Sequence, residues 1–282
     1  MNRFTNIKLI ECPRDAIQGI DAFIPTQKKI NYLNYLLSLN VFDTIDFGSF
    51  VSPKLIPQMA DTATVIRGLN LSKTNTKLLA IVANERGAEE ATQYDSIQYL
   101  GYPFSISETF QIRNTNATIE KSVVRLRNIQ NICIQKNKQL VVYISMAFGN
   151  PYQDRWDAEI VMEWLEKLKA FDIQIFSLSD TVGVATIESI NYLCSHIIPY
   201  NSDLEIGLHL HTESSNWKEK IEAALYQCCS RFDGAILGYG GCPMAQDELV
   251  GNMPMENLLA YFKKAKDVEI GEMIAQFNEL IT

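Results

Sequence analysis

The chain has 282 residues, of which 47% are apolar and 21% charged, and this length suits one α/β barrel domain of about 250 residues. A formal net charge of −8 argues against a nucleic-acid partner, because neutralising phosphates takes clustered Lys and Arg. The sequence predicts neither a signal peptide nor a membrane helix, since no window reaches the roughly 20 apolar residues that a membrane span needs.

Short β-branched runs alternate with amphipathic stretches along the whole chain. In chain order, the runs predict strands at residues 7–11, 44–47, 78–83, 97–100, 140–145, 174–178, 204–211 and 234–237. Helices are expected between them, for example after Pro25 and Thr26, and after Asp157, whose side chain suits an N-cap.

Eight such units predict a single (β/α)8 TIM-barrel domain over residues 1–282, with a short C-terminal helical extension from about residue 265. An open doubly wound sheet is the alternative. The absence of a Gly-rich phosphate fingerprint after the first strand disfavours it. The six cysteines are scattered and indicate reduced thiols, so we expect a cytoplasmic protein.

In a TIM barrel, the reactive side chains come from the C-terminal ends of the strands and the loops that follow. Polar residues at these places come from distant parts of the chain and are candidates for the active site. They are Arg14, Asp15, Asp46, Ser49, Ser179, Asp180, His209, His211 and Cys242.

Two of the three histidines form the sequence His209-Leu210-His211. Residues two apart on a strand face the same way, so both imidazoles would point into the barrel mouth. They are either metal ligands or hydrogen-bonded core histidines, and an unpaired buried pair would be costly. Asp15 would add a carboxylate and Asn252 an amide oxygen, although alone they could be a salt-bridged residue and a turn residue. The mixed set favours Mg²⁺ or Mn²⁺ over structural zinc.

Several short motifs occur in the order typical of one enzyme family. They are Pro13-Arg14-Asp15-Ala16-Ile17-Gln18, Ser49-Phe50-Val51-Ser52-Pro53-Lys54, Pro57-Gln58-Met59, Ser179-Asp180-Thr181-Val182-Gly183, His209-Leu210-His211, Gly240-Gly241-Cys242-Pro243, and Gly251-Asn252 with Glu256. Through them the chain resembles the hydroxymethylglutaryl-CoA lyases of the DRE-TIM metallolyase family, from about Ile7 to about Phe262. The Arg-Asp and His-x-His motifs mark the wider group, whereas the Gly-Gly-Cys-Pro loop is more specific to the lyases.

The resemblance implies retro-Claisen cleavage of 3-hydroxy-3-methylglutaryl-CoA, or a close 3-hydroxyacyl-CoA, to acetyl-CoA and acetoacetate. The family's ligands for Mg²⁺ or Mn²⁺ would be Asp15, His209, His211 and Asn252. Its catalytic residues would be Arg14, Asp15, His209 and Cys242. Arg14 would stabilise the enolate on the thioester oxygen, and Cys242 would protonate that enolate or shield it from water. His209 would also carry protons.

Other positions would bind the substrate or orient these groups. By resemblance, Asp46 and Asn114 would join Arg14 in binding substrate, while Asp180 and Glu256 would orient the metal ligands or Arg14. The family further implies an acyl-CoA as small-molecule partner, a homodimer, and a place in leucine degradation or ketone-body formation.

Four departures from the lyase pattern leave the metal set whole. The family has Glu at the position of Asp46, Asp at that of Thr212 and Lys at that of Asp21. The segment from Cys242 to Asn252 is one residue longer than usual, with Asp247, Glu248, Leu249 and Val250 in it. Misplaced polar contacts reduce the affinity for a substrate. These changes therefore leave undecided which acyl group the substrate carries.

Two other functions remain as alternatives. One is a condensing acyl-CoA synthase of the same barrel family, which the Gly-Gly-Cys-Pro loop and the lack of an extra regulatory domain disfavour. The other is a degenerate barrel that binds CoA esters without turnover, which the intact set of predicted ligands disfavours.

Overall fold

Eight parallel strands close into a barrel in the computed structural model, which describes residues 6–241 and 250–282. The strands follow one another around the barrel in sequence order, and the last pairs with the first. They are β1 Lys8–Glu11, β2 Thr44–Ser49, β3 Lys77–Ile81, β4 Ile97–Ser105, β5 Gln139–Ser145, β6 Ile175–Ser179, β7 Glu205–His209 and β8 Arg231–Gly234. The predicted closed barrel is therefore confirmed, and the open sheet is excluded.

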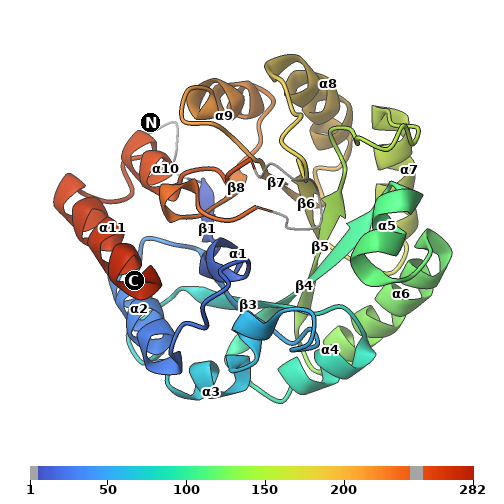
Figure 1. The fold of residues 1–282 in the computed structure, drawn as a ribbon. Helices are drawn as coiled ribbons and strands as arrows, with labels where there is room; N and C mark the ends of the chain where they lie inside the picture. The colour runs from blue at the N-terminus through green and yellow to red at the C-terminus, as the bar shows by residue number, and fades with distance from the viewer. Residues whose placement is uncertain (1–5, 242–249) are drawn as a thin grey trace.

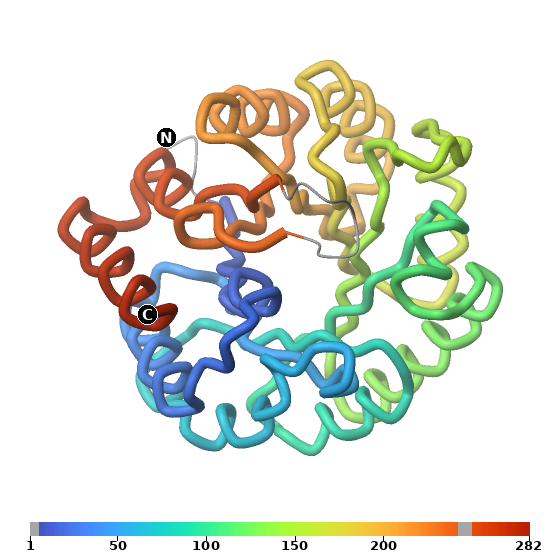
Figure 2. Tube along the Cα trace, viewed as in Figure 1, coloured from blue at the N-terminus to red at the C-terminus, as the bar shows by residue number. Residues whose placement is uncertain are grey.

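Helices surround this barrel, except α1, which lies inside the ring that the others form (Figure 1). The α-helices of the described residues are α1 Pro13–Ile17, α2 Thr26–Leu39, α3 Thr62–Arg67, α4 Glu85–Ala91, α5 Glu108–Thr115, α6 Ile119–Gln135, α7 Ala158–Lys169, α8 Ile187–Ile197, α9 Trp217–Tyr226, α10 Met255–Tyr261 and α11 Asp267–Ile281. Short 3₁₀ turns are η1 Pro57–Met59, η2 Ile198–Tyr200 and η3 Ile236–Gly238. The chain makes one circuit, so α11 packs against α2 (Figure 2).

The two helices that local sequence predicted most clearly begin where expected. Helix α2 follows Pro25 and buries Leu33, Leu36 and Leu37 against the sheet. Helix α7 begins after Asp157, whose side chain accepts a hydrogen bond from the N–H of Ile160 at 2.8 Å. An N-cap carboxylate satisfies one of the free amide groups that every helix N-terminus exposes.

Two strand predictions need correction. The eighth strand is Arg231–Gly234 rather than residues 234–237, which instead enter η3, where Leu237 has a φ of 57°. The apolar pattern does not mark this strand, because the strand carries Arg231 and Asp233. Both are charged yet buried inside the barrel. The seventh strand ends at His209, so His211 lies beyond it.

The barrel interior is divided between an apolar half and a charged half. Strands β3 to β6 contribute an apolar cluster of Leu79, Ile81, Tyr99, Val141, Tyr143 and Ile175. Strands β1, β7 and β8 contribute Lys8, Glu205, Arg231 and Asp233, which contact one another in ion pairs. The charged half lies below the strand ends that carry His209 and Asp15.

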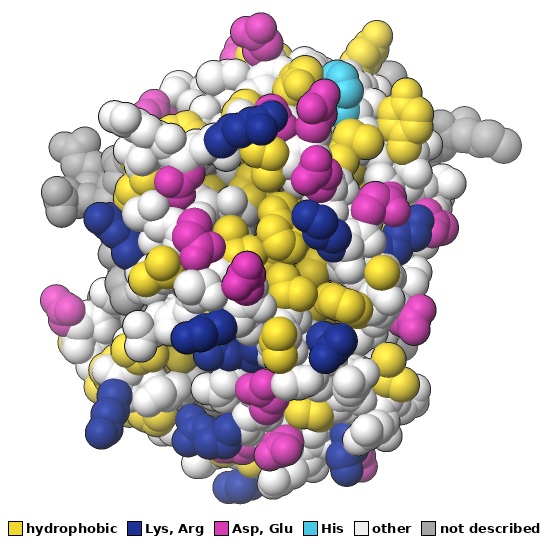
Figure 3. Space-filling view, turned by 90° about the vertical axis from the view of Figure 1, so that its right-hand side faces the viewer, with side chains coloured by type: hydrophobic (Ala, Val, Ile, Leu, Met, Phe, Trp, Pro, Cys, Tyr) yellow, Lys and Arg dark blue, Asp and Glu magenta, His cyan; other side chains and the backbone are white. Residues whose placement is uncertain are grey.

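The outer surface mixes charges of both signs. Figure 3 shows one side face, on which Lys and Arg side chains stand among Asp and Glu around a group of apolar side chains. Among the described helices, none has the length and apolarity that a membrane crossing requires.

Candidate active site

A cavity of about 480 Å³ opens at the C-terminal ends of the strands. Its polar wall includes Arg14, Asp15, Asn114, Thr181, His209 and His211. Its apolar wall includes Phe23, Val51, Leu55, Ile56, Phe110 and Tyr143. A cavity of this size with convergent polar groups on one side is typical of a small-molecule site.

Helix α1 places two of the predicted residues in this cavity. It begins at Pro13, directly after β1, because the fixed φ of proline and its missing N–H suit the first helical position. The helix is short and buried, and it carries Arg14 and Asp15 over the barrel mouth.

The Arg14 guanidinium is held by three side chains. Its Nε and Nη2 groups donate to the same oxygen of Asp46 at 3.0 and 2.5 Å. Its Nη1 group donates to Asp15 at 2.8 Å and to Gln18 at 2.9 Å. The Asp46 side chain therefore reaches Arg14, although it is one methylene shorter than the Glu of the family pattern.

The two carboxylates around Arg14 titrate differently. Burial raises the pKa of Asp46 to about 6, even though Arg14 acts in the opposite direction. Burial also opposes ionisation of Asp15, but Arg14 and His209 together lower the pKa of that carboxyl below its usual value. Asp15 is thus a carboxylate over the whole physiological range, as a metal ligand must be.

Asp15, His209 and His211 converge on one point. One ligand atom from each lies within 4.8 Å of the other two. Burial, with His209 beside it, lowers the pKa of His211 to about 4, so this imidazole is neutral at pH 7. His211 reaches the point from outside the strand, because a backbone bridge to Asn252 fixes it there.

Asn252, the fourth predicted metal ligand, contacts Asp15 directly. Its Nδ2 group donates to Asp15 at 2.7 Å and to the backbone oxygen of Tyr239 at 2.8 Å. The loop after β8 passes close over α1 at Gly240, which has a φ of 90°, and a Cβ there would lie 2.5 Å from the Asp15 backbone oxygen. A side chain at this position would therefore push the loop away from the site.

The donor set fits a divalent cation. Asn252 Oδ1 and His211 Nε2 are both buried and have no hydrogen-bond partner among the described residues. Unpaired buried acceptors are costly, and a bound cation would satisfy both. One carboxylate, two neutral nitrogens and one amide oxygen suit Mg²⁺ or Mn²⁺.

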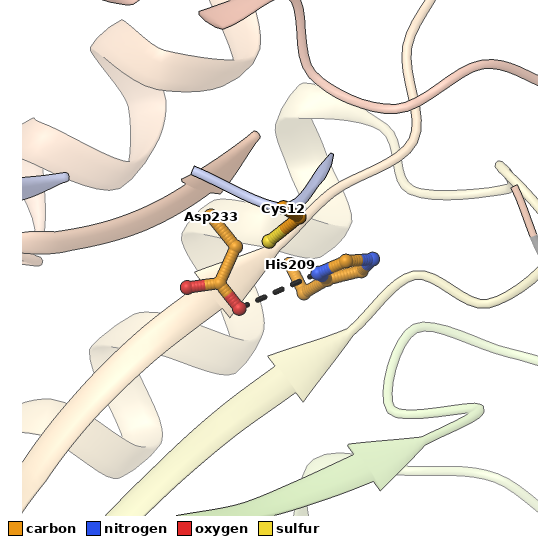
Figure 4. Close-up of side chains that lie close together, drawn as sticks. All are labelled: Cys12, His209 and Asp233. Atoms are coloured by element: carbon orange, nitrogen blue, oxygen red, sulfur yellow. Dashed lines mark hydrogen bonds and ion pairs between the residues drawn. The ribbon is translucent and has the colours of Figure 1, made fainter. Parts of the chain in front are cut away.

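A second cluster, of Cys12, His209 and Asp233, has similar spacing but different chemistry (Figure 4). Burial and the nearby Asp233 raise the pKa of the Cys12 thiol well above its usual value. A metal ligand must be a thiolate, so an ion in this cluster would first have to displace a tightly held proton, which makes the cluster the less favourable site. In this cluster Asp233 binds His209 itself, with its Oδ2 3.3 Å from His209 Nδ1.

Sequence reasoning missed Asp233. It stands just before the expected strand at residues 234–237, whereas in the structure it lies in β8 directly beside His209 of β7. The local sequence gives little signal for this strand, because Asp and Gly are both depleted in strands.

The remaining predicted residues are placed as follows. Asp180 is buried, caps the turn at Val184 and Ala185, and pairs with Lys220, which donates to the His211 carbonyl at 2.7 Å. Glu256 accepts a hydrogen bond from the N–H of Leu237 at 2.8 Å, so it binds the loop after β8. Asn114 lines the cavity. Cys242 lies outside the described residues.

The departures from the family pattern lie in different environments. Asp21 is exposed at the edge of the cavity. Thr212 is buried and donates its N–H to the carbonyl of Gly251 at 2.8 Å, beside Asn252. Of the longer segment, Asp247, Glu248 and Leu249 lie outside the described residues.

The chain is similar to known proteins over most of its length. The HMGL-like family model matches residues 6–280. Hydroxymethylglutaryl-CoA lyase YngG of Bacillus subtilis is 31% identical over 257 residues, which cover 91% of this chain and 84% of that protein. A 3-hydroxy-3-isohexenylglutaryl-CoA/hydroxymethylglutaryl-CoA lyase of Pseudomonas aeruginosa is 29% identical, with 96% and 89% covered. The structure of an HMG-CoA lyase from Acinetobacter baumannii with coenzyme A and 3-methylmalate has a TM-score of 0.90 at 26% identity, with 98% and 91% covered.

The raised pKa of Asp46 predicts how stability depends on pH. Between its unfolded value of 3.8 and its folded value of about 6, the folded protein holds this proton more tightly than the unfolded chain. The stability of the wild type relative to Asp46→Asn should therefore be greatest below pH 3.8 and fall by about 3 kcal/mol as the pH rises to about 6. Urea unfolding of both proteins across this range measures it. A difference that grows with pH would show that Arg14 outweighs burial.

Proposed function

Since the chain belongs to the HMGL-like family, we propose that it is a divalent-metal-dependent lyase that cleaves 3-hydroxy-3-methylglutaryl-CoA, or a close 3-hydroxyacyl-CoA, to acetyl-CoA and acetoacetate. The observation that carries the proposal is the convergence of Asp15, His209 and His211 within 4.8 Å beside the Arg14 guanidinium. A carbon–carbon lyase needs both a site that acidifies a hydroxyl group and a fixed cation for the enolate.

Asp15, His209, His211 and Asn252 would hold Mg²⁺ or Mn²⁺. When bound, the ion supplies Lewis acidity that lowers the pKa of the tertiary hydroxyl of the substrate. His209 would face the ion with the ring nitrogen that is not engaged by Asp233. With both His209 nitrogens engaged, the Asp15 carboxylate is the group that would accept a proton from the substrate. The proton-carrying role that the family implies for His209 would require His209 to leave the ion.

Arg14 would stabilise the acetyl-CoA enolate that forms when the substrate is cleaved. When the bond between C2 and C3 breaks, its electron pair moves to the thioester oxygen of the leaving acetyl-CoA enolate. Arg14 is always charged and is held by Asp46, Asp15 and Gln18, so it needs no reorganisation to stabilise that oxygen. In this scheme, Asp46 contributes to substrate binding by orienting Arg14.

The enolate must then take a proton at carbon. Following the family pattern, we assign this role to Cys242, either as the proton donor or as part of a cover that keeps water out. Glu256 would hold the start of the loop after β8, because it accepts a hydrogen bond from the N–H of Leu237. Asp180 would hold His211 through Lys220, and Asn114 would contact the substrate from the cavity wall.

Further assignments rest on relatives alone. We propose a homodimer in the cytoplasm, with a role in leucine degradation or ketone-body formation. The name of the Pseudomonas relative includes a larger C3 substituent, isohexenyl, so acyl chains of both sizes should be assayed.

The central test is a coupled assay. Purified protein with Mg²⁺ or Mn²⁺ should release acetyl-CoA from 3-hydroxy-3-methylglutaryl-CoA, and EDTA should abolish the release until metal is restored. Asp15→Asn should be inactive at the same metal concentration, because a metal ligand has been replaced. Binding of the CoA ester without turnover would instead identify a degenerate barrel. Condensation of acetyl-CoA with an oxo acid, without cleavage of the CoA ester, would identify a condensing enzyme.

Arg14→Met tests the enolate role separately from the metal role. We expect kcat to fall by about 10²- to 10³-fold, as is usual when a charge-stabilising donor is removed, while Mn²⁺ affinity stays near that of the wild type. Steady-state kinetics and Mn²⁺ titration measure the two effects. Arg155→Met is the matched control, since that side chain is 78% exposed and pairs with Asp157. An equal loss of metal binding and kcat in Arg14→Met would contradict the assignment.

A further inference from the structure

One imidazole nitrogen of His209 is already engaged before any metal binds. Asp233 Oδ2 lies 3.3 Å from His209 Nδ1, and the two residues are direct partners across β7 and β8. Figure 4 shows the other ring nitrogen on the far side of the imidazole from Asp233. A carboxylate oxygen can only accept, so Nδ1 must donate its proton in this contact.

The Asp233 carboxylate is itself fixed in place. The same oxygen, Oδ2, accepts a hydrogen bond from Ser177 Oγ of β6 at 3.1 Å. Its other oxygen, Oδ1, lies 3.7 Å from Nη2 of Arg231. Asp233 is 1% exposed, so these contacts are screened little by water.

Arg231 continues the chain of contacts toward the barrel base. Its Nη1 group donates to Glu205 at 3.2 Å, and Glu205 pairs in turn with Lys8. Gly207 makes room for this arginine, because a Cβ there would lie 2.6 Å from its Cδ. Lys8, Glu205, Arg231, Asp233 and His209 thus form a ladder of alternating charge, called the interior ladder below, that ends at the candidate metal site.

We propose that Asp233 is a positioning residue that fixes His209 as the Nδ1–H tautomer and so keeps the lone pair on its cavity-facing nitrogen. This inference rests on the proposed function, since it assigns that nitrogen to the ion held with Asp15 and His211. Within the interior ladder, Arg231 pairs with Asp233, and Asp233 in turn accepts a hydrogen bond from the His209 imidazole.

The physical reason lies in what the ring would do without this contact. A neutral imidazole can carry its proton on either nitrogen, and near the Asp15 carboxylate a proton on the cavity-facing nitrogen would be favoured. That tautomer directs its N–H toward the negative charge of Asp15 and has no lone pair to offer a cation. Asp233 makes Nδ1–H the better choice, and contacts of this kind typically change metal affinity by about 10- to 100-fold.

The first experiment uses the unaltered, metal-free chain. Long-range ¹H–¹⁵N correlation spectra report which imidazole nitrogen carries the proton. The chain has three histidines, so His209 can be assigned with His209→Gln as reference. At a pH about two units above the ordinary imidazole value, Nδ1 of His209 should be protonated and the other nitrogen bare. A proton on the other nitrogen would overturn the proposal without any variant having to fold.

The second experiment compares two variants at the same oxygen. Asp233→Asn keeps the shape but can donate to Nδ1, so the tautomer should reverse and the Mn²⁺ dissociation constant, from electron paramagnetic resonance, should rise about 10- to 100-fold. Ser177→Ala removes a hydrogen bond to the same oxygen but leaves the carboxylate, so it should keep the wild-type tautomer. If Asp233→Asn binds Mn²⁺ as tightly as Ser177→Ala, the proposal is wrong.

Kinetics then separate positioning from a purely structural effect. In Asp233→Asn, saturating Mn²⁺ should restore most of kcat, because the metal site is weakened and Arg14 is intact. A kcat that stays low with Mn²⁺ bound and the tautomer unchanged would mean a folding defect and would overturn the proposal. These outcomes are distinct from failure of the lyase function, in which the wild type would be inactive while its His209 tautomer stayed as described.

Discussion

The pairing of β1 with β8 is the constraint on which the site depends. It closes the barrel and places Glu11 beside Gly234, so residues at the two ends of the chain share one rim. Asp15 can then contact Asn252, 237 positions later, at 2.7 Å. Without this closure the predicted ligands would lie on separate elements with no common point. The fold therefore acts on function mainly by bringing distant strand ends together.

The division of the barrel interior explains why the candidate metal ligands lie on one side of the cavity. The apolar half on β3 to β6 includes Ile81 and Tyr143, which also line the cavity. The charged half on β1, β7 and β8 supports the ligands, and burying these charges is tolerable because each is paired. At the rim, Arg14 and Asp46 are likewise buried charges that pair with each other. The shorter Asp46 side chain still accepts hydrogen bonds from two nitrogens of the Arg14 guanidinium, so this departure from the family pattern leaves the ion pair intact.

Much of this could be predicted from the sequence, because the signals were local. Runs of β-branched residues predicted most strands, and Asp157 predicted the start of α7. The polar residues that follow the predicted strands included most of the candidate metal ligands. The predictions failed where tertiary contacts override local pattern. The eighth strand was misplaced because Arg231 and Asp233 look like surface residues until Gly207 and Glu205 are seen around them. His211 was expected on a strand, but its position comes from a bridge to Asn252 that no local signal reveals.

The proposed lyase requires one divalent ion bound jointly by Asp15, His209, His211 and Asn252. Anomalous diffraction from a crystal grown with Mn²⁺ tests this most directly. The account predicts a single strong peak at the barrel mouth, within coordination distance of these four side chains. A strong peak elsewhere, or an ion that contacts Cys12 and Asp233 instead, would contradict it.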